Sequence, residues 1–289
     1  MDAGIEKAVI RVIESMRENL GDELTMDDLA RTARFSKFHF SRIFQRVTGI
    51  TPGRFLSALR LQKAKQLLVS TDLNVTDISH RVGYTSVGTF STRFSSSVGI
   101  SPATYRRLGG YVPAFAPQVA QAGDGASRAG AVVRGRVLAA PTVPSGAIFI
   151  GLFPDRLHQG RPAAHALLRQ PGPYVLRDVP LGTWHLLVHL VPGNHPPAVM
   201  PGEMPSYVGR TDPIIIRSPH ELCTTDVLLR PMHLFDPPVL LAMIDVRPTA
   251  PGVAAAESGS VAKINGAPCG SSPEATFVHR RGVADRAWR

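Results

Sequence analysis

One segment of the chain occurs twice, and this repeat limits the possible folds more than any other feature of the sequence. The first copy begins at Asp28 and reads DLARTARFSKFHFSRIFQRVTGITPGRF, and the second begins at Asp77 and reads DISHRVGYTSVGTFSTRFSSSVGISPATY. The offset is 49 residues and becomes 50 after the turn inside the unit. The matched pairs include Asp28 with Asp77, Leu29 with Ile78, Phe35 with Tyr84, Phe40 with Phe90, Phe44 with Phe94, Gly49 with Gly99 and Pro52 with Pro102. We interpret the repeat as an internal duplication of one structural unit.

Each copy predicts two helices joined by a short turn. An acidic first turn opens the first helix, the turn between the helices carries Arg34 or Gly83, and the second helix begins near Ser36 or Ser86. This order of elements is the layout of a helix-turn-helix unit. The whole region up to residue 108 has apolar residues at helical spacing, so we expect an all-α domain of seven helices.

The second helix of the first copy has two chemically distinct faces. Apolar residues at helical spacing form a buried face, namely Phe40, Ile43, Phe44 and Val47. The outward positions are Lys37, Ser41, Arg42 and Gln45. Arg and Lys reach guanine or phosphate oxygens, and Gln and Ser pair with adenine or backbone oxygens. A solvated basic helix would explain one such face, but duplication of the unit favours a recognition helix for DNA.

A single long helix is predicted between the two units, over the sequence PGRFLSALRLQKAKQLLVST. Its apolar residues, such as Phe55 and Leu59, lie on one side, and Arg60, Lys63 and Lys65 lie elsewhere. At about 1.5 Å per residue the helix is on the order of 27 Å long, comparable to the roughly 34 Å between successive major-groove faces of B-DNA. One copy of the chain could therefore contact two adjacent groove segments.

Charge supports a polyanionic partner. The 289 residues contain 32 Lys and Arg against 22 Asp and Glu, a net charge of +10. Residues 36–107 hold eleven Lys or Arg against Asp72 and Asp77, a net charge of +9. The two cysteines, Cys223 and Cys269, are too few for a disulfide framework or a four-cysteine zinc site, so we expect a cytoplasmic, nucleoid-associated protein with no cofactor and no metal.

The rest of the chain predicts three further regions. Residues 109–131 are rich in Ala, Gly, Pro and Gln and predict a flexible linker. Residues 132–247 contain seven β-type runs, VVRGRVLA, GAIFIGLF, YVLRDV, TWHLLVHLV, PIIIR, TDVLLR and VLLAMIDV, and we expect a small antiparallel β-sandwich. Residues 248–289 predict a disordered tail. The longest uncharged stretch, within 179–202, holds too many prolines for a transmembrane helix, so no membrane partner is expected.

Two features of the β region suggest binding chemistry. His185 and His189 alternate with the apolar residues of TWHLLVHL, but positions four apart on a strand lie about 13 Å from each other, too far for one zinc ion. We therefore expect solvated or partner-facing histidines rather than a metal site. The long connection VPGNHPPAVMPGEMPSYVGRTD could form one wall of a ligand pocket, although an extended surface loop is the favoured interpretation.

Residues 5–108 resemble the DNA-binding domain of AraC/XylS-type bacterial transcription regulators. The runs that carry the resemblance are FSKFHFSRIFQRVTGITPGRFL, LRLQKAKQLL, VTDISHRVGYTSVGTFSTRF and GISPATYRR. The resemblance implies sequence-specific binding of promoter or operator DNA through two helix-turn-helix units in adjacent major-groove segments. The candidate DNA-binding residues are Lys37, Phe38, Ser41, Arg42, Gln45 and Arg46 in the first unit, and Ser86, Val87, Gly88, Thr89, Ser91 and Thr92 in the second.

The second unit departs from the family pattern. Thr92 stands where the family usually has an arginine, and Arg93 aligns with the apolar Ile43 on the flank of the core face. Arg93 is therefore expected to reach a phosphate at most and not to read a base. We expect the second helix to contribute positioning and shape contacts more than hydrogen-bonded readout.

The β region resembles carboxypeptidase-regulatory-like or transthyretin-like sandwich modules more weakly, through GAIFIGLF and PGPYVLRDVPLGTWHLLVHL. That resemblance implies a fold and no activity. Effector sensing, self-association and contact with another protein such as RNA polymerase stay open for residues 132–247. By the resemblance to AraC-type regulators, the first two are favoured.

Two other classes of function are weighed against a specific regulator. A non-specific architectural DNA-binding protein would account for the charge without promoter recognition. Some proteins fuse this DNA-binding module to a DNA-repair alkyltransferase, but those need a Pro-Cys-His-Arg nucleophile, and here Pro268-Cys269-Gly270 lies in the predicted tail. A phosphate loop, a Ser-His-Asp constellation and a paired-carboxylate site are also missing from the sequence, so we expect no enzyme.

Overall fold

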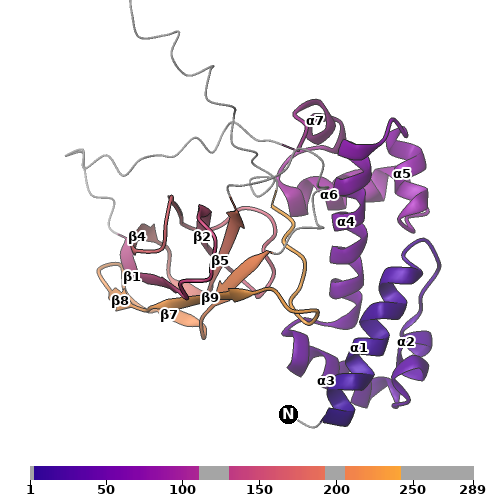
Figure 1. The fold of residues 1–289 in the computed structure, drawn as a ribbon, viewed down its shortest axis with the longest axis horizontal. Coiled ribbons are helices and arrows are strands. Elements are labelled where there is room, and N and C mark those ends of the chain that lie inside the picture. The colour runs from indigo at the N-terminus through magenta and orange to yellow at the C-terminus, as the bar shows by residue number, and fades with distance from the viewer. Residues whose placement is uncertain (1–2, 111–129, 193–205, 242–289) are drawn as a thin grey trace, which may run out of the picture. The chain divides into compact units, whose positions relative to one another are not determined.

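The computed structural model describes residues 3–110, 130–192 and 206–241 (Figure 1). Met1–Pro248 forms one compact unit, and the second unit, Thr249–Arg289, lies outside the described residues. The helices of the described part are α1 (Ala3–Glu18), α2 (Met26–Ala33), α3 (Lys37–Thr48), α4 (Pro52–Ser70), α5 (Val75–Arg81), α6 (Val87–Val98) and α7 (Pro102–Arg107). The predicted all-α N-terminal domain is confirmed.

The repeat in the sequence is a repeat in backbone geometry. Helices α2 and α3 form the first helix-turn-helix unit, and α5 and α6 form the second. The turn residue Arg34 has φ 60° and its counterpart Gly83 has φ 83°, so both turns use the left-handed conformation. The two recognition helices also end alike, because Gly49 (φ 88°) follows α3 and Gly99 (φ 98°) follows α6.

Side-chain caps fix where several of these helices begin. Thr25 and Asp28 form a capping box at α2, in which each side chain accepts from the backbone N–H of the other. Ser86 accepts from the backbone N–H of Thr89 at the start of α6. Pro52 occupies the first turn of α4, where its missing N–H would have had no helical partner.

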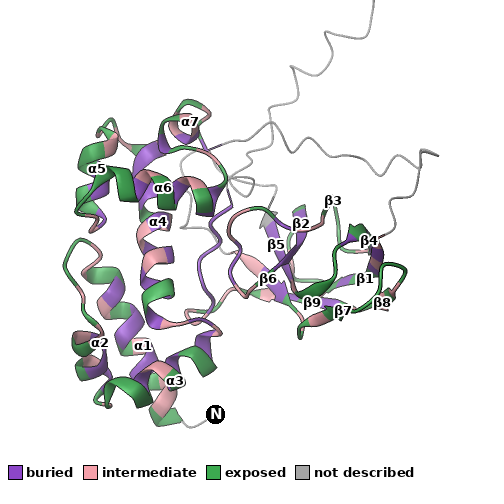
Figure 2. Cartoon of the chain, turned by 180° about the vertical axis from the view of Figure 1, so that it is seen from behind, coloured by how far each residue is buried: buried purple, intermediate pink, exposed green. Residues whose placement is uncertain are grey.

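Each unit has its own set of contacting aromatic rings in the helical core. Phe44 contacts Phe40 and Phe55 with ring centroids 5.5 and 5.4 Å apart, both edge to face. In the second unit Phe94 contacts Phe90 and Tyr105 at 5.6 Å each. These side chains are fully buried, and Figure 2 shows the buried positions of α1 and α4 turned toward their neighbours. The matched phenylalanines of the repeat are therefore core residues in both copies.

The β region is one mixed sheet. Its strands are β1 (Ala131–Ala139), β2 (Gly146–Phe153), β3 (His165–Leu168), β4 (Pro173–Val179), β5 (Gly182–Pro192), β6 (Tyr207–Arg210), β7 (Ile214–Ile216), β8 (Leu222–Thr224) and β9 (Val227–Pro231). The main strand order is β3-β2-β5-β6-β9-β1-β4, and β7 pairs with β5 while β8 pairs with β1. The two end strands, β3 and β4, contact each other, so the sheet is nearly closed.

This arrangement differs from the expected antiparallel sandwich. β1 pairs in parallel with both β8 and β9, whereas its other neighbour, β4, is antiparallel. The cause is the return of the chain after β7, which brings β8 and β9 alongside β1 in the same direction. Parallel pairing of this kind depends on long-range connections, which local hydrophobic patterns do not encode. The sheet is therefore a curled, mixed sheet and not a clear sandwich.

Strand β2 is buried on both faces, which explains its unbroken apolar sequence. Ile148, Ile150 and Leu152 point into the core of the sheet, and Phe149 and Phe153 pack on the other face. Residues 232–241, which follow β9, cover that second face.

Residues 239–241 do not form the strand that the sequence predicts for this segment. They begin the run VLLAMIDV, yet they form no strand, and residues 242–246 lie outside the described part. Val239 and Leu241 pack on β2 and β5, while Leu240 is fully buried in the helical core. This segment, orange in Figure 1 and largely buried in Figure 2, runs beside α4. Alternating contacts with two cores, and not strand pairing, explain its apolar pattern.

Some expectations fall outside the described residues. They include most of the predicted linker (111–129), the greater part of the long connection after β5 (193–205) and the predicted tail. Among the helices that the structure does describe, none combines the length and hydropathy needed to cross a bilayer.

Candidate nucleic-acid interface

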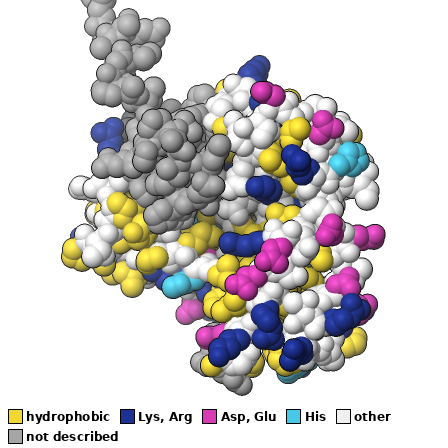
Figure 3. All heavy atoms as spheres, turned by 45° about the vertical axis from the view of Figure 1, so that its right-hand side comes forward, with side chains coloured by type: hydrophobic (Ala, Val, Ile, Leu, Met, Phe, Trp, Pro, Cys, Tyr) yellow, Lys and Arg dark blue, Asp and Glu magenta, His cyan; other side chains and the backbone are white. Residues whose placement is uncertain are grey.

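The two recognition helices each present an exposed polar face next to a buried phenylalanine face. In α3 the exposed residues of the candidate set are Lys37, Phe38, Arg42, Gln45 and Arg46, and Ser41 is half-buried. In α6 and its cap the exposed residues are Ser86, Val87, Gly88, Thr89 and Thr92, and Ser91 is half-buried. Figure 3 shows Lys and Arg side chains gathered at the lower end of the helical domain, the height at which Figure 1 places α2 and α3.

The surface of α3 is the more strongly charged of the two. Phe38 projects from its first turn with 85% of its surface exposed, although it is apolar. Lys37 forms an exposed ion pair with Asp27 of α2, with Nζ 2.9 Å from the carboxylate. Such an exposed pair stabilises the fold by roughly 0–1 kcal/mol, so a phosphate can take over Lys37 at small cost. Arg42 and Arg46 have no ion pair among the described residues and remain open to an anion.

The surface of α6 is small and nearly neutral. A Cβ added to Gly88 would meet only the Ser86 hydroxyl, at 3.7 Å, so open space lies over the helix backbone at this point. Val87 is 39% exposed, and Thr89 and Thr92 supply hydroxyl groups. A surface of this kind allows close approach of a partner without placing a charge on it.

The helical part of the chain matches known proteins. A family model described as "Helix-turn-helix domain" matches residues 29–108. The Transposon Tn10 TetD protein of Escherichia coli is 34% identical over 92 residues, which cover 32% of this chain and 67% of that protein. The chain belongs to the AraC family of helix-turn-helix regulators.

Three further matches show how much of the chain this AraC-family similarity covers. The HTH-type transcriptional activator AarP of Providencia stuartii is 34% identical over 88 residues, 30% of this chain and 65% of AarP. A solved AraC-type regulator from Chromobacterium violaceum is 26% identical and covers 42% of this chain and 100% of that one, with a TM-score of 0.35. The chain spans only 33% of the melibiose operon regulatory protein of Escherichia coli. The family consists of transcription regulators and is not an enzyme family.

Arg93 of the AraC-family domain lies at the edge of the core face of α6, with an exposed side chain. Its counterpart Ile43 is 3% exposed, but Arg93 itself is exposed. It lines a shallow surface hollow together with Gly88, Thr89 and Thr92. Arg93 also borders α4, because it lines a second hollow together with Ala58, Leu61 and Leu240. It therefore lies at the edge of the core face, as its alignment with Ile43 predicts, and its side chain reaches the surface.

Several basic residues of the AraC-family domain serve its structure. Arg60 donates to the backbone oxygens of Leu20 and Asp22, at 3.0 and 2.7 Å. Arg106 donates to the carbonyls of Leu68, Thr71 and Leu73, and so satisfies the end of α4 and the residues after it.

Lys65 does not belong to the exposed positive charge that the sequence predicts for residues 36–107. The sequence places it outside the apolar side of the long helix, yet it is only 4% exposed. Its Nζ donates to the backbone oxygen of Leu241 at 3.2 Å and lies 5.7 Å from the centre of the Tyr105 ring. The charge on residues 36–107 is therefore divided between an exposed surface and internal contacts.

His189 of β5 is buried, contrary to expectation, whereas His185 is half-buried. His189 is 3% exposed and lies beside His158, with ring centroids 6.4 Å apart. Burial lowers the pKa of His158 to about 4, against smaller opposing effects of Asp236 and Val188. Burial, then His158 and Lys65, holds the pKa of His189 well below its usual value. Within the described part of the chain, His, Cys, Asp and Glu side chains form no cluster of three or more that could hold a metal ion.

Proposed function

We propose that the protein is a sequence-specific transcription regulator that binds promoter or operator DNA, with α3 and α6 in adjacent major-groove segments. The observation that carries this proposal is the exposure of two matching recognition helices on either side of α4. With 19 residues, α4 is about 28 Å long, close to the roughly 34 Å between successive major-groove faces. One copy of the chain can then span two groove segments.

We propose direct contacts to DNA for both sets of outward residues. On α3 these are Lys37, Phe38, Ser41, Arg42, Gln45 and Arg46, and in the second unit they are Ser86, Val87, Gly88, Thr89, Ser91 and Thr92, with Arg93 added as a phosphate contact. Arg42 is the main base-reading candidate because an arginine bonds guanine through two donors at once. Thr92 at the corresponding place has one hydroxyl, so its contribution is smaller.

The β region, residues 132–247, is proposed as a sensor that acts on the DNA-binding domain, residues 1–108. Contacts of three kinds support this role over simple tethering. Arg54 of α4 pairs with Asp155 at 2.7 Å, Leu157 is buried in the helical core, and Lys65 bonds the backbone of Leu241. Self-association through the β region and contact with RNA polymerase are further proposals, and residues 109–131 and 248–289 are proposed as linker and tail.

Selection of bound sequences from a random DNA library tests the proposed function. We expect the full chain to enrich a motif about two helical turns long, with affinity at least about a thousandfold above that for random DNA at physiological salt. A non-specific architectural protein would instead enrich no motif and would bind all sequences alike with a steep dependence on salt. Absence of a motif would therefore overturn the proposal.

A further inference from the structure

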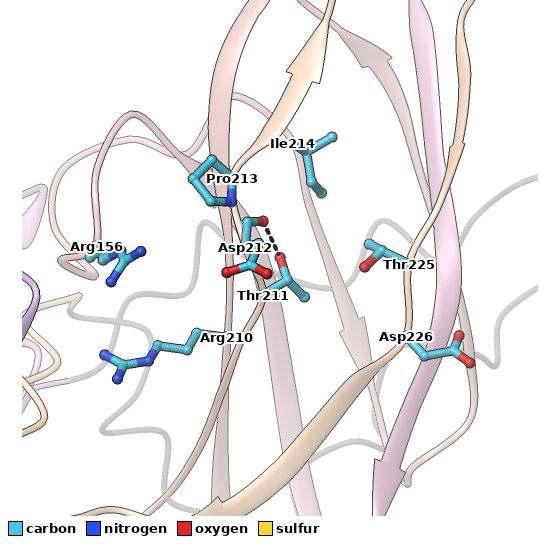
Figure 4. A pocket seen from close by; sticks show the side chains of 8 residues that line it. All are labelled: Arg156, Arg210, Thr211, Asp212, Pro213, Ile214, Thr225 and Asp226. Carbon is cyan, nitrogen blue, oxygen red and sulfur yellow. Dashed lines mark hydrogen bonds between the residues drawn. The ribbon is translucent and has the colours of Figure 1, made fainter. Parts of the chain in front are cut away.

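A polar hollow of about 640 Å³ opens on the β region and has no part in DNA binding as proposed above. Its lining includes Arg156, Arg210, Thr211, Asp212 and Thr225. Figure 4 shows the two arginines on one side of the hollow and Thr225 and Asp226 on the other side. Thr211 and Asp212 lie in the middle. Two guanidinium groups at one opening are an unusual lining, because they repel each other unless an anion joins them.

Among the described residues, the carboxylate that pairs with Arg210 is a distant one. Its Nη1 lies 4.0 Å from the Oδ1 atom of Asp236. That carboxylate already binds Arg230 through both oxygens, at 2.6 and 2.7 Å, and accepts the backbone N–H of His233 at 2.7 Å. Burial lowers the pKa of Arg210, and the neighbouring Arg230 and Arg156 lower it further against the effect of Asp236. The charge on Arg210 is therefore poorly compensated.

Arg156 has no ion pair among the described residues. The adjacent carboxylate, Asp155, is taken by Arg54 of α4. Asp212 also lines the hollow, and within the described residues it forms no ion pair with either arginine. The other carboxylate of the lining, Asp226, accepts the backbone N–H of Arg136 at 2.8 Å and points away from the two arginines in Figure 4. Within the described residues neither arginine therefore has a close carboxylate partner, and an anionic ligand would supply one.

We propose that the hollow between Arg156 and Arg210 binds the anionic group of a small molecule, a carboxylate or a phosphate. Arginine presents several donors in a planar fork that suits both groups. The volume accommodates a small metabolite rather than an ion alone. The β region then senses an anionic effector. Only this sensing role rests on the proposed function, since binding itself needs no DNA.

Arg156 also connects the hollow to the first recognition helix. A Cβ placed on Gly49, which ends α3, would lie 2.9 Å from the Cδ atom of Arg156, so the stem of Arg156 rests on the end of this helix. The flanking residues Asp155 and Leu157 contact α4 and the helical core. An anion that draws Arg156 toward Arg210 therefore acts on a side chain that touches α3.

Thermal unfolding of the full chain without DNA tests the site, with inorganic phosphate and succinate as probes at constant ionic strength. We expect at least one probe to raise the midpoint by about 3 °C when it is tenfold above its Kd. R156Q and R210Q should lose this rise. R177Q should keep it, because Arg177 is an exposed arginine of β4 away from the hollow.

Circular dichroism without added anion checks that each variant is folded. If R156Q does not fold, R156K keeps the stem against Gly49 and one charge, and it should show a smaller rise than the wild type. Absence of any rise in the wild type, or an equal rise in R156Q and R210Q, would overturn the proposal.

DNA phosphate is the other source of the same chemistry, and a salt titration of DNA binding distinguishes it. Each phosphate contact contributes about 0.9 to the slope of log K against log salt concentration. We expect R156Q and R210Q to leave this slope unchanged. A decrease of about one for each variant would assign the two arginines to the DNA backbone and would overturn the small-molecule site.

Discussion

Acidification should destabilise this protein through the buried His158. The side chain is fully buried, its Nε2 atom has no hydrogen-bond partner among the described residues, and its pKa is lowered to about 4. In the unfolded chain the pKa returns to about 6.5, so the unfolded state binds more protons between pH 6.5 and pH 4. Stability therefore rises with pH across this window and is lost as the pH falls through it. At pH 5, which is 1.5 units below 6.5, the loss is about 2 kcal/mol at about 1.36 kcal/mol per unit.

Urea unfolding followed by circular dichroism at pH 7.5 and pH 5 measures this loss. The control is His158→Gln, which cannot titrate and whose other costs are the same at both pH values. The neighbouring groups Asp236, His189 and Lys65 remain in both proteins. The difference between wild type and variant therefore measures the titration of His158, together with its repulsion of His189. We expect the wild type to lose about 2 kcal/mol more than the variant. An equal loss in the two proteins would refute the assignment.

Three further predictions concern the stability of the helical domain, measured by urea unfolding. Arg34→Gly should be neutral or stabilise by up to about 1 kcal/mol, because Arg34 holds φ 60°. Gly83→Ala at the matching turn should destabilise by more than that, since its Cβ would collide with the backbone oxygen of Leu20 at φ 83°. Phe44→Ala should cost about 3–5 kcal/mol, because the ring is fully buried between Phe40 and Phe55. Destabilisation by Arg34→Gly, stabilisation by Gly83→Ala, or a small loss at Phe44 would contradict these arguments.

The helical domain was predictable because its information is local and is present twice. Acidic first turns, turn residues and phenylalanines at helical spacing occur in both copies, so each copy supports the interpretation of the other. Arg34 shows this well, since Gly83 at the same position marks a left-handed turn that arginine alone would not indicate.

The β region was predicted less well because its pairing is long-range. The short strands β3, β6 and β8 were missed, since three or four residues carry little periodicity. His189 follows the alternation expected of an outward position, but residues 232–241 cover that face of the sheet. Lys65 is hidden in the same way by the backbone at Leu241. A sequence pattern gives the face on which a residue lies, but not whether a distant segment covers it.

The central claim is that the two recognition helices read DNA unequally, with α3 supplying most of the base readout. The ratio of Kd for scrambled DNA to Kd for the selected motif tests this claim, measured for the wild type, Arg42→Ala and Thr92→Ala. We expect Arg42→Ala to lower the ratio roughly five- to 150-fold, which corresponds to about 1–3 kcal/mol, and Thr92→Ala to lower it by less than about threefold. Equal losses in both variants, or an unchanged ratio in Arg42→Ala, would contradict the account.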